Sequence, residues 1–490
     1  MGKTCRLGVG EPRTEAGGEL RDAAGGGGSG GREYGDARGS SPWQLQLLLG
    51  GDIRSSLLTL RHLKQLDLSG NNFGGQPIPE LIGALGRGRL THLNLSESHF
   101  GCRIPPHLGN LSKMVSLQLN HMADGTYSPD LAWVPRLRKL QVLGMYRVDL
   151  SAAVNWLHAI NILPSLTDLD LSYCALPNSI SPPAHSNLTK LQTLSLVSNT
   201  FNTSLGAKNL LWDLPSLQNL FLNGCGIDGP IPDAVGNLTS LQSLYLGSNK
   251  FTGMVPLSFQ KLQNLIELVL ETNFVIMDVA ELLHRLGNFS SLAKIDLDNN
   301  DLYGEVPVSI RELINLDELS LAHNNLHGTI TQSIGALQAL ESFDLSHNGL
   351  SGKIPTSISS LTSLTRLNLS YNDLSGTIPS GNQLRTLEDQ ASIYTGNPGL
   401  CGPPVPRNCS RTDIIPYAPQ EHNEGMSDVV SLYLSMCIGF VVGLWIVFCG
   451  FLFKRKWRIG WFSFTDHMYD RAYVHVAMGW ASLARNIRQG

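Results

Sequence analysis

The chain has 490 residues, a formal net charge of −4 and only 16% charged residues. This charge balance gives no reason to expect nucleic acid as a partner, and the length exceeds what one compact core usually supports. Eight cysteines are too few for a small disulfide-rich scaffold. With 50 glycines and 25 prolines, the composition instead suits a chain that turns at short, regular intervals.

The N-terminal segment differs in composition from the rest. Residues 1–42 contain a glycine-rich run at 25–31 and almost no apolar residues, so we expect a disordered, low-complexity segment. Met1 is not followed by the apolar stretch that is typical of a secretory signal. Residues 43–62 are expected to form a partial cap or a degenerate first repeat, because only scattered leucines occur there.

A motif of the form LxxLxLxxN recurs thirteen times between residues 63 and 374, at steps of 24 to 27 residues. We number these repeats as rungs one to thirteen. They begin at residues 63, 90, 114, 140, 166, 191, 217, 241, 265, 292, 316, 340 and 364. A repeat of this length cannot bury its apolar face alone, so the rungs must stack into a solenoid.

Each rung has the same internal order of elements. The LxL segment has period two, which predicts a short strand with inward leucines. A Gly and Pro turn follows, as in 300–307, and residues such as 309–313 then predict a short helical or 3₁₀ turn. The predicted fold is an α/β repeat over 63–396, a right-handed solenoid with a parallel sheet on its concave face and short 3₁₀ or helical turns on its convex face.

The ninth position of the rung is usually Asn, whose amide can donate and accept where the backbone turns inward. It is Asn at residues 71, 199, 249, 273, 300, 324, 348 and 372. Cys174 and Cys225 fill the same position as small, weakly hydrogen-bonding alternatives. Ser98, Met122 and Val148 depart from the pattern, so we expect local irregularity between residues 90 and 165.

The segment after the repeats predicts a membrane anchor. Residues 397–428 are expected to form a C-terminal cap, with a disulfide between Cys401 and Cys409, and an acidic juxtamembrane spacer. Residues 429–453 carry no charge and are long enough for a transmembrane helix across ~30 Å of hydrocarbon. The basic run that follows predicts a single-pass type I protein of the plasma membrane, with extracellular repeats and a short cytoplasmic tail at 454–490.

Short motifs predict a helix-contact site and several glycosylation sites. Gly439 and Gly443 are spaced for close approach of a second transmembrane helix, although glycine is also common in membrane helices. N-glycosylation sequons predict a glycoprotein. The preferred sites are Asn110, Asn187, Asn202, Asn237, Asn288 and Asn408. Asn94 and Asn368 are weaker candidates because they fall within predicted strands.

The concave face carries the candidate ligand site. Between the inward leucines, three consecutive rungs have apolar residues, Phe221, Tyr245 and Val269. The acidic residues beside this strip are Glu267, Glu271, Asp296, Asp298, Asp317 and Glu318, relieved by Lys294. Exposed aromatic strips often mark contact sites, so we expect a peptide or protein ligand with apolar and basic groups across rungs seven to eleven. The alternative is unselected variation on an unused face.

No enzymatic or metal-binding signature is recognised in the sequence. The spacing of Asp296, Asp298 and Asn300 resembles the start of a calcium loop, but the loop's glycine and terminal glutamate are missing. No HExxH or GxSxG motif occurs, and no group of residues forms an evident nucleophile and base. We therefore expect a binding protein without catalytic residues, cofactor, metal or nucleic-acid partner.

The rung at 364–379 resembles the plant-type extracellular leucine-rich repeat. The C-terminal segment adds the spacings Ser435-Met436-x-x-Gly439-Phe440-x-x-Gly443, Trp457-Arg458-x-x-Trp461-Phe462 and Asp466-x-x-Tyr469-Asp470-x-x-Tyr473-Val474. Together these resemble plant leucine-rich-repeat receptor-like proteins, which are cell-surface receptors without a kinase, many of them in pathogen recognition.

The resemblance implies partners as well as a fold. It implies an extracellular peptide or protein ligand and a leucine-rich-repeat receptor kinase as adaptor, contacted through Gly439, Gly443 and the acidic spacer. The spacer residues are Glu421, Glu424 and Asp428. It also implies a co-receptor at residues 292–396. The chain departs from the family in lacking a recognisable signal peptide, a paired Cys and Trp cap and a non-repeat island before the last four rungs.

Three alternatives to a defence receptor stay open at this point. A developmental peptide co-receptor would have the same architecture. A relative of the soluble inhibitors of wall-degrading enzymes would share the repeats, although the apolar segment at 429–453 argues against it. A non-functional, truncated member of the family is the third.

Overall fold

The structure is a computed structural model that describes residues 53, 57, 62–85, 89–178, 186–206, 209–286 and 291–409. The chain divides into two units, Met1–Ile414 and Ile415–Gly490, and every described residue lies in the first. The predicted transmembrane helix at 429–453 lies outside the described residues. Within the described ranges, no helix is long and apolar enough to cross a membrane.

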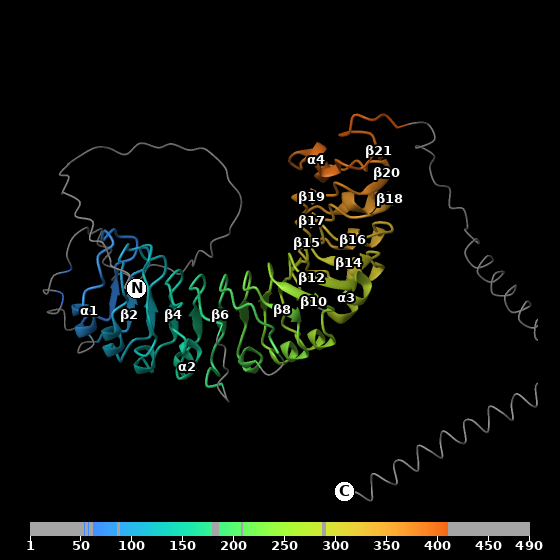
Figure 1. The fold of residues 1–490 in the computed structure, drawn as a ribbon. Helices are drawn as coiled ribbons and strands as arrows, with labels where there is room; N and C mark the ends of the chain where they lie inside the picture. Colours follow the sequence, from blue (N-terminus) through green and yellow to red (C-terminus); the bar gives the residue numbers. More distant parts are fainter. Residues whose placement is uncertain are drawn as a thin grey trace, which may run out of the picture. The chain divides into compact units, whose positions relative to one another are not determined.

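A single parallel sheet of thirteen strands runs through the repeats, and its strands follow one another in sequence order (Figure 1). The strands are β1 (Gln65–Asp67), β2 (His92–Asn94), β3 (Ser116–Gln118), β4 (Val142–Gly144), β5 (Asp168–Asp170), β6 (Thr193–Ser195), β7 (Asn219–Phe221), β9 (Ser243–Tyr245), β11 (Glu267–Val269), β13 (Lys294–Asp296), β15 (Glu318–Ser320), β17 (Ser342–Asp344) and β19 (Arg366–Asn368). Each pair joins equivalent positions of neighbouring rungs, as Leu244 faces Leu268. The predicted parallel-strand solenoid is therefore confirmed.

The core is the stack of apolar side chains that point inward from these strands. Leu244 and Leu268, at the middle of β9 and β11, are 0% exposed. The buried apolar residues of all the described rungs join into one continuous cluster. Each rung completes its core only by contact with the next, as expected for a repeat that cannot fold alone.

Short helices lie on the other side of the rungs, where the sequence predicts them. The 3₁₀ helices are η3 (Pro106–Asn110), η4 (Val134–Arg136), η5 (Leu210–Asp213), η6 (Asp233–Asn237), η7 (Leu257–Lys261), η8 (Val308–Glu312), η9 (Gln332–Ala336), η10 (Thr356–Ser360) and η11 (Gln383–Arg385). The α-helices are α1 (Leu81–Ala84), α2 (Trp156–Asn161), α3 (Val279–Leu286) and α4 (Gln390–Tyr394). Pro begins η3 at Pro106, where its fixed φ suits the first helical position, and Pro307 precedes η8 as an extended N-cap residue.

A second parallel sheet, which the sequence analysis did not predict, follows the main strands in the middle rungs. Its strands are β8 (Asp228–Pro230), β10 (Lys250–Gly253), β12 (Phe274–Asp278), β14 (Asp301–Gly304) and β16 (Asn325–Leu326). They occupy the Gly-containing segment that the sequence analysis assigned to a turn. Gly253 (φ 74°) and Gly304 (φ 92°) let the chain turn at the ends of β10 and β14.

The asparagine at the ninth position holds adjacent rungs together. The Nδ2 group of Asn249 donates to the carbonyl oxygens of Leu246 (2.9 Å) and, in the preceding rung, Leu222 (2.8 Å). Its Oδ1 accepts from the backbone nitrogens of Cys225 and Ile227, both at 3.0 Å. The amide thus pairs buried backbone groups on two rungs, which is the role expected from the sequence.

The irregularity expected between residues 90 and 165 is absent from the main sheet. Strands β2 to β5 pair residue for residue, although Ser98, Met122 and Val148 replace the asparagine. The difference lies beside the sheet, since the second sheet begins only at β8 and the earlier described rungs have isolated bridges such as Pro77 to Gly101. The main-strand register is therefore kept in these rungs without an asparagine at the ninth position.

The last described segment continues the stack. A third sheet contains β18 (Ser351–Lys353), β20 (Asp373–Thr377) and β21 (Gly399–Cys401). Asn397 extends the asparagine series, because its Oδ1 accepts from Leu374 and its Nδ2 donates to Leu369. The predicted disulfide between Cys401 and Cys409 is present and closes this end.

Candidate ligand-binding surface

Three side chains per rung point away from the core on the main sheet, at the third, fifth and seventh positions. We call the outward residues of rungs seven to eleven the central surface. Their strands β7, β9, β11, β13 and β15 pair in unbroken register. Neighbouring parallel strands lie ~4.8 Å apart, so equivalent side chains on successive rungs are in contact range. The register therefore brings residues far apart in sequence into one surface.

An aromatic pair marks the first half of the central surface. The ring centroids of Phe221 and Tyr245 are 5.0 Å apart with a tilt of 48°. The hydroxyl of Tyr245 donates to Glu267 Oε2 at 3.0 Å, which fixes the ring against the next rung. Both rings are half-buried, so they present edges and faces that a partner can cover without reorganisation.

The predicted apolar strip is wrong at its third member. Val269 is only 4% exposed, so its side chain belongs to the buried part of the surface. In the sheet register it lies between Tyr245 and Asp296, and both side chains are longer than valine. The neighbours cover the shorter residue, and the accessible apolar area is confined to Phe221 and Tyr245.

Glu271 has the most perturbed carboxyl of the central surface. Burial raises its pKa to about 7, and the negative charge of Asp296 contributes to the shift. A hydrogen bond from Asn223 and the charge of Lys294 act in the opposite direction but are smaller effects. Its Oε2 atom is buried and has no hydrogen-bond partner. A carboxylate in this setting would gain from contact with a ligand cation.

Two aspartates of rung ten extend the acidic region. Burial also raises the pKa of Asp298, to about 6, although the Ser320 hydroxyl and the Ala322 backbone nitrogen donate to it. Burial raises the pKa of Asp296, and the charge of Lys294 only partly opposes this. Three carboxyls are thus brought together in a half-buried environment that disfavours their negative charge.

The remaining predicted acidic residues are arranged differently. Lys294 Nζ lies 2.9 Å from Glu318 Oε2, so the cation of this region is already paired. Asp317 is exposed, and burial followed by the charge of Glu318 raises its pKa. The structure therefore brings together Glu271, Asp296 and Asp298, whereas Glu267 is bonded to Tyr245 and Glu318 to Lys294.

Two residues of this surface were missed by the sequence analysis. A Cβ atom at Gly247 would lie 1.8 Å from Glu271 Oε2, so only glycine leaves room for the carboxylate there. Asn223, on the preceding rung, carries a buried Oδ1 atom without a partner. Both occupy the seventh position, which the sequence analysis did not compare between rungs. Aligning that position would have placed Asn223, Gly247 and Glu271 in one row.

Ring clusters outside the central surface were also missed. His323, His347 and Tyr371 stack in succession, with centroid distances of 4.0 and 4.3 Å. Near the other end, Arg147 lies 5.7 Å from the ring centroids of both Tyr146 and Tyr173. Five of these six residues occupy the eighth position, where φ is positive, and Tyr146 occupies the seventh.

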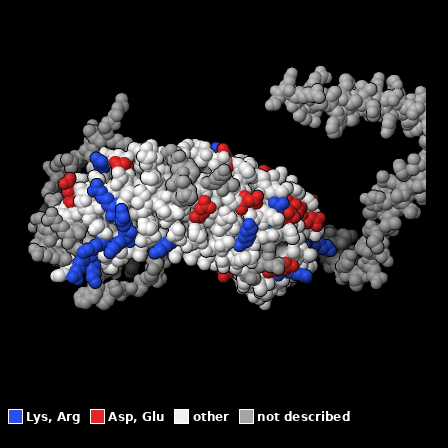
Figure 2. Space-filling view, turned by 90° about the horizontal axis from the view of Figure 1, so that it is seen from below, with Lys and Arg blue, Asp and Glu red and all other residues white. Residues whose placement is uncertain are grey.

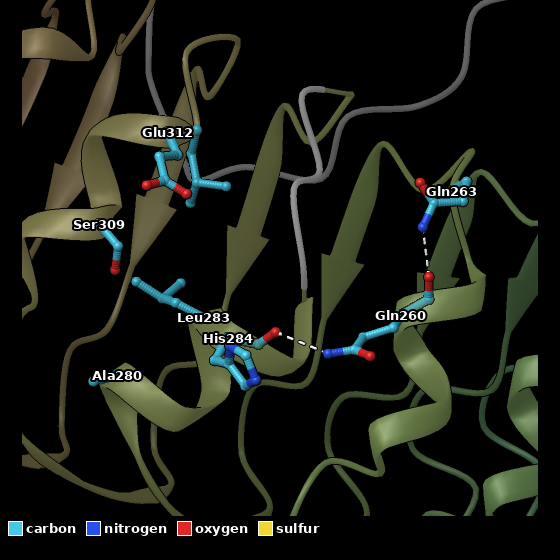
Figure 3. A pocket seen from close by; sticks show the side chains of 8 residues that line it. Gln260, Gln263, Ala280, Leu283, His284, Ser309 and Glu312 are labelled. Carbon is cyan, nitrogen blue, oxygen red and sulfur yellow. Dashed lines mark hydrogen bonds between the residues drawn. The ribbon is translucent and has the colours of Figure 1, made fainter.

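A shallow pocket of about 580 Å³ lies on the helical side, between η7, α3 and η8 (Figure 3). Gln260 donates to the carbonyl oxygen of His284 across one edge of it. Ser309, His284 and Glu312 also line the pocket, but no hydrogen bond between these three described side chains is present. The pocket therefore lacks the contacts of a nucleophile and base pair.

The other predicted sites divide by whether the structure describes them. The described preferred sequons Asn110, Asn187, Asn202, Asn237 and Asn408 are exposed, whereas Asn94 and Asn368 are half-buried. Asn288, Gly439 and Gly443 lie outside the described residues. Among the described residues, no group of three or more His, Cys, Asp or Glu side chains could hold a metal ion.

Family models agree with the repeat geometry. A leucine-rich-repeat model matches residues 314–374, and a second matches 62–85, 89–111, 216–238 and 240–262. The rungs at these residues are leucine-rich repeats. Receptor-like protein EIX2 of Solanum lycopersicum is 34% identical over 264 residues, which are 53% of this chain and 25% of that protein. Receptor-like protein EIX1 of the same species is 35% identical over 196 residues, covering 39% and 18%.

The resemblance of this leucine-rich-repeat chain to plant receptor-like proteins is thereby confirmed, over a quarter or less of those relatives' lengths. Two solved structures have 26% identity: the plant peptide hormone receptor RGFR1 in complex with RGF2 and PEPR1 with AtPEP1. The first has a TM-score of 0.53 and covers 68% of this chain and 55% of that one. The second has a TM-score of 0.56 and covers 71% and 46%.

Proposed function

We propose that this protein is a plant cell-surface receptor-like protein whose central surface binds an extracellular peptide or protein ligand. The proposal depends on one observation. An aromatic pair lies on the same sheet face as carboxyl groups whose negative charge is disfavoured by burial. Phe221 and Tyr245 supply a rigid apolar contact, and Glu271, Asp296 and Asp298 supply the acidic one. A ligand that combines an apolar side chain with Lys or Arg fits this surface.

The comparisons support a peptide as the ligand class. Two structures similar to this chain, with TM-scores of 0.53 and 0.56, are receptors in complex with RGF2 and AtPEP1. An extended peptide can lie across successive rungs and meet one set of outward side chains per strand. Such a ligand would use the five-rung width of the central surface better than a small molecule could, because small molecules are usually bound in enclosed pockets.

The proposed setting is the plasma membrane, with a single-pass type I arrangement and extracellular, glycosylated repeats. The disulfide between Cys401 and Cys409 and the exposed sequons favour an oxidising compartment. The uncharged segment at 429–453 favours a membrane anchor. Signalling would pass through a leucine-rich-repeat receptor kinase adaptor and a co-receptor, in keeping with the resemblance to plant receptor-like proteins.

Defence signalling with a pathogen-derived ligand is the biological role that we propose, in keeping with the resemblance to receptor-like proteins. A developmental peptide co-receptor is the second candidate, and the similarity to a structure named a peptide hormone receptor favours it. Ligand identity separates the two roles. The same central surface would serve both, so the binding experiment below tests the shared part of the proposal.

The ligand surface can be tested with an array of synthetic peptides that combine aromatic or aliphatic residues with Lys and Arg. The full chain is expected to bind a subset of these peptides. Replacing Phe221 and Tyr245 by Ala should weaken that binding by about tenfold or more, since paired aromatic residues commonly dominate such contacts. Replacing His347 and Tyr371 by Ala removes another stacked ring pair and should leave binding unchanged. Equal binding by the Phe221→Ala, Tyr245→Ala variant and the wild type would refute the proposed surface.

The partner proposal needs a separate experiment on plant membranes. The full chain with a C-terminal tag is expected to co-purify with a receptor kinase. Replacing Gly439 and Gly443 by Leu should abolish that recovery, because bulky side chains prevent close packing of two helices. Replacing Val441 and Val442 by Leu keeps the spacing glycines and is the matched control. Undiminished recovery with the glycine variant would exclude this helix contact.

A further inference from the structure

A second surface, unrelated to the central surface, occurs at the position directly before each rung. In the early rungs this position is basic: Arg89, Lys113, Lys139 and Lys190 precede rungs two, three, four and six. All four side chains are exposed, and the exposed Arg136 and Arg138 lie close by in sequence. We call these six residues the basic edge.

The sheet register aligns the basic edge across rungs. Each of the four residues lies three positions before a paired strand residue, namely His92, Ser116, Val142 and Thr193. The backbone keeps this register two residues after the edge, where Val115 donates to Thr91 and Gln141 donates to Val115. Cations on rungs two to four are therefore spaced by about one strand separation, ~4.8 Å at the sheet.

The later rungs use the same position for a different purpose. Ser216, Ser240 and Asn264 donate to the carbonyl oxygens of Thr189, Pro215 and Thr239, at 2.7 to 2.9 Å. Ser291 and Ser363 form the equivalent bond back to the preceding rung. Side-chain hydrogen bonding between rungs is thus common at this position, whereas the side chains of Arg89, Lys139 and Lys190 form no such bond with another described residue. The contrast indicates that the early rungs use the position for contact with a partner.

The charge distribution supports an anionic partner. Figure 2 shows Lys and Arg gathered on the N-terminal side of one face, whereas Asp and Glu gather toward the other side. Among the described residues, Arg89, Lys139 and Lys190 form no ion pair with a carboxylate. A row of uncompensated cations raises the local concentration of polyanions and binds them in a salt-dependent way.

We propose that the basic edge binds a linear acidic polysaccharide with one carboxylate per sugar, a polyuronate. A polymer with regularly spaced charges matches one cation per rung. Membrane binding is less favoured because the described basic edge lacks aromatic or apolar side chains that would insert into lipid. Nucleic acid is less favoured because no exposed aromatic ring accompanies these cations for base stacking. The cations also lie in the same described repeats as the disulfide between Cys401 and Cys409, which favours an extracellular polymer.

The test measures binding of the full chain to a long polygalacturonate and to the same polymer with its carboxylates fully methyl-esterified. Binding is expected only to the charged polymer and should weaken as salt rises. Replacing Arg89, Lys139 and Lys190 by Ser should weaken it roughly tenfold or more and flatten the salt dependence. Folding should be retained, since Ser is the ordinary residue at this position, and thermal unfolding checks this.

Two further variants make the result decisive. Replacing Lys250, Lys261 and Arg311 by Ser removes the same charge from exposed sites outside the edge and should leave binding unchanged. Replacing Ser216 and Ser240 by Lys extends the edge to rungs seven and eight and should tighten binding. Equal weakening by both triple variants, tighter binding to anionic vesicles or single-stranded DNA than to polygalacturonate, or equal binding of the esterified polymer would overturn the proposal.

Discussion

Asn249 illustrates how much of this fold depends on single polar side chains. It pairs with five buried backbone groups, three of them carbonyls at 2.8 to 3.0 Å and two of them backbone nitrogens at 3.0 Å. The backbone must turn inward after each strand, which leaves these groups without partners of their own. On the rungs that have asparagine at the ninth position, one amide satisfies them, so the side chain is part of the backbone hydrogen-bond network.

Replacing Asn249 by Ala should therefore destabilise the repeats by about 2–4 kcal/mol, because several buried groups lose their partner at once. Asn264→Ala is the control, since it removes one exposed hydrogen bond to Thr239 and should cost less than about 1 kcal/mol. Chemical denaturation of both variants gives the comparison. Equal, small losses of unfolding free energy in the two variants would mean that the asparagine series does not stabilise the repeats in this way.

Glu271 makes stability depend on pH in a direction that is unusual for a carboxyl. Its pKa is raised from 4.5 to about 7 in the folded chain, so the folded state binds the proton more tightly than the unfolded state. Its contribution is fully present below about pH 4.5 and is lost as pH rises to about 7. Glu271→Gln should flatten this part of the profile and raise stability at pH 8 by about 1 kcal/mol, after allowance for solvent screening.

The measurement for Glu271 is the unfolding free energy between pH 4 and 8, with the exposed Glu388→Gln as the charge-matched control. A pH profile of Glu271→Gln that coincides with the wild type would contradict the assignment. Ligand binding should show the opposite trend, since a cation pairs with the deprotonated carboxylate. Affinity for a basic peptide should therefore rise between pH 5 and 8 and should lose much of that rise in Glu271→Gln.

At the scale of elements, two strands of the second sheet, β10 and β14, end in a glycine with positive φ. Gly253 has φ of 74°, and a Cβ atom added there would meet no other atom within 4 Å. Gly206 also has open space around it, but its backbone is not in the left-handed region. The two positions differ only in conformation, so they separate backbone strain from crowding.

Gly253→Ala should cost about 1–2 kcal/mol through left-handed strain alone, whereas Gly206→Ala should change stability by less than about 0.5 kcal/mol. Thermal or denaturant unfolding of the two variants checks this. If the two alanine variants were equally stable, the turn after β10 would not require glycine.

The elements that the sequence predicts best are those with an apolar period. The LxL segments predict the main strands because each inward leucine is fixed by burial, as Leu244 and Leu268 are. The second sheet was missed because its strands contain Gly and Pro, which normally favour turns, and are stabilised by neighbouring rungs. Val269 was misjudged for a related reason, since its exposure depends on Tyr245 and Asp296 on the adjacent rungs.

For the candidate site, the sequence predicts which residue types are present but not which side chains contact one another. The aromatic and acidic residues could be identified from their place in the rung. The sequence could not show that Lys294 is paired with Glu318 or that Gly247 makes room for Glu271. Those contacts depend on side-chain conformations that differ from rung to rung, so they become visible only in three dimensions.

At the scale of the whole repeat unit, stability should vary along the stack. A rung in the middle is covered on both sides, whereas a rung at either end has one neighbour, and local opening starts where contacts are fewest. Backbone hydrogen exchange should therefore be slowest in β9 to β13 and faster in β1 and β2. Mass spectrometry of exchange in the full chain measures this. Uniform protection from β1 to β19 would mean that the rungs unfold as one cooperative block.

The unbroken one-to-one register of the main strands has a consequence for how such a chain can change. Because each rung meets its neighbours through equivalent positions, as Leu220 meets Leu244, removing one entire rung would leave the two flanking rungs with matching faces. Deleting rung five, which contributes no cation to the basic edge and no ring to the aromatic pair, would move the pair one step closer to the cations of rungs two to four. Gain or loss of a whole rung can thus change the distance between two binding surfaces while the residues of each surface stay the same.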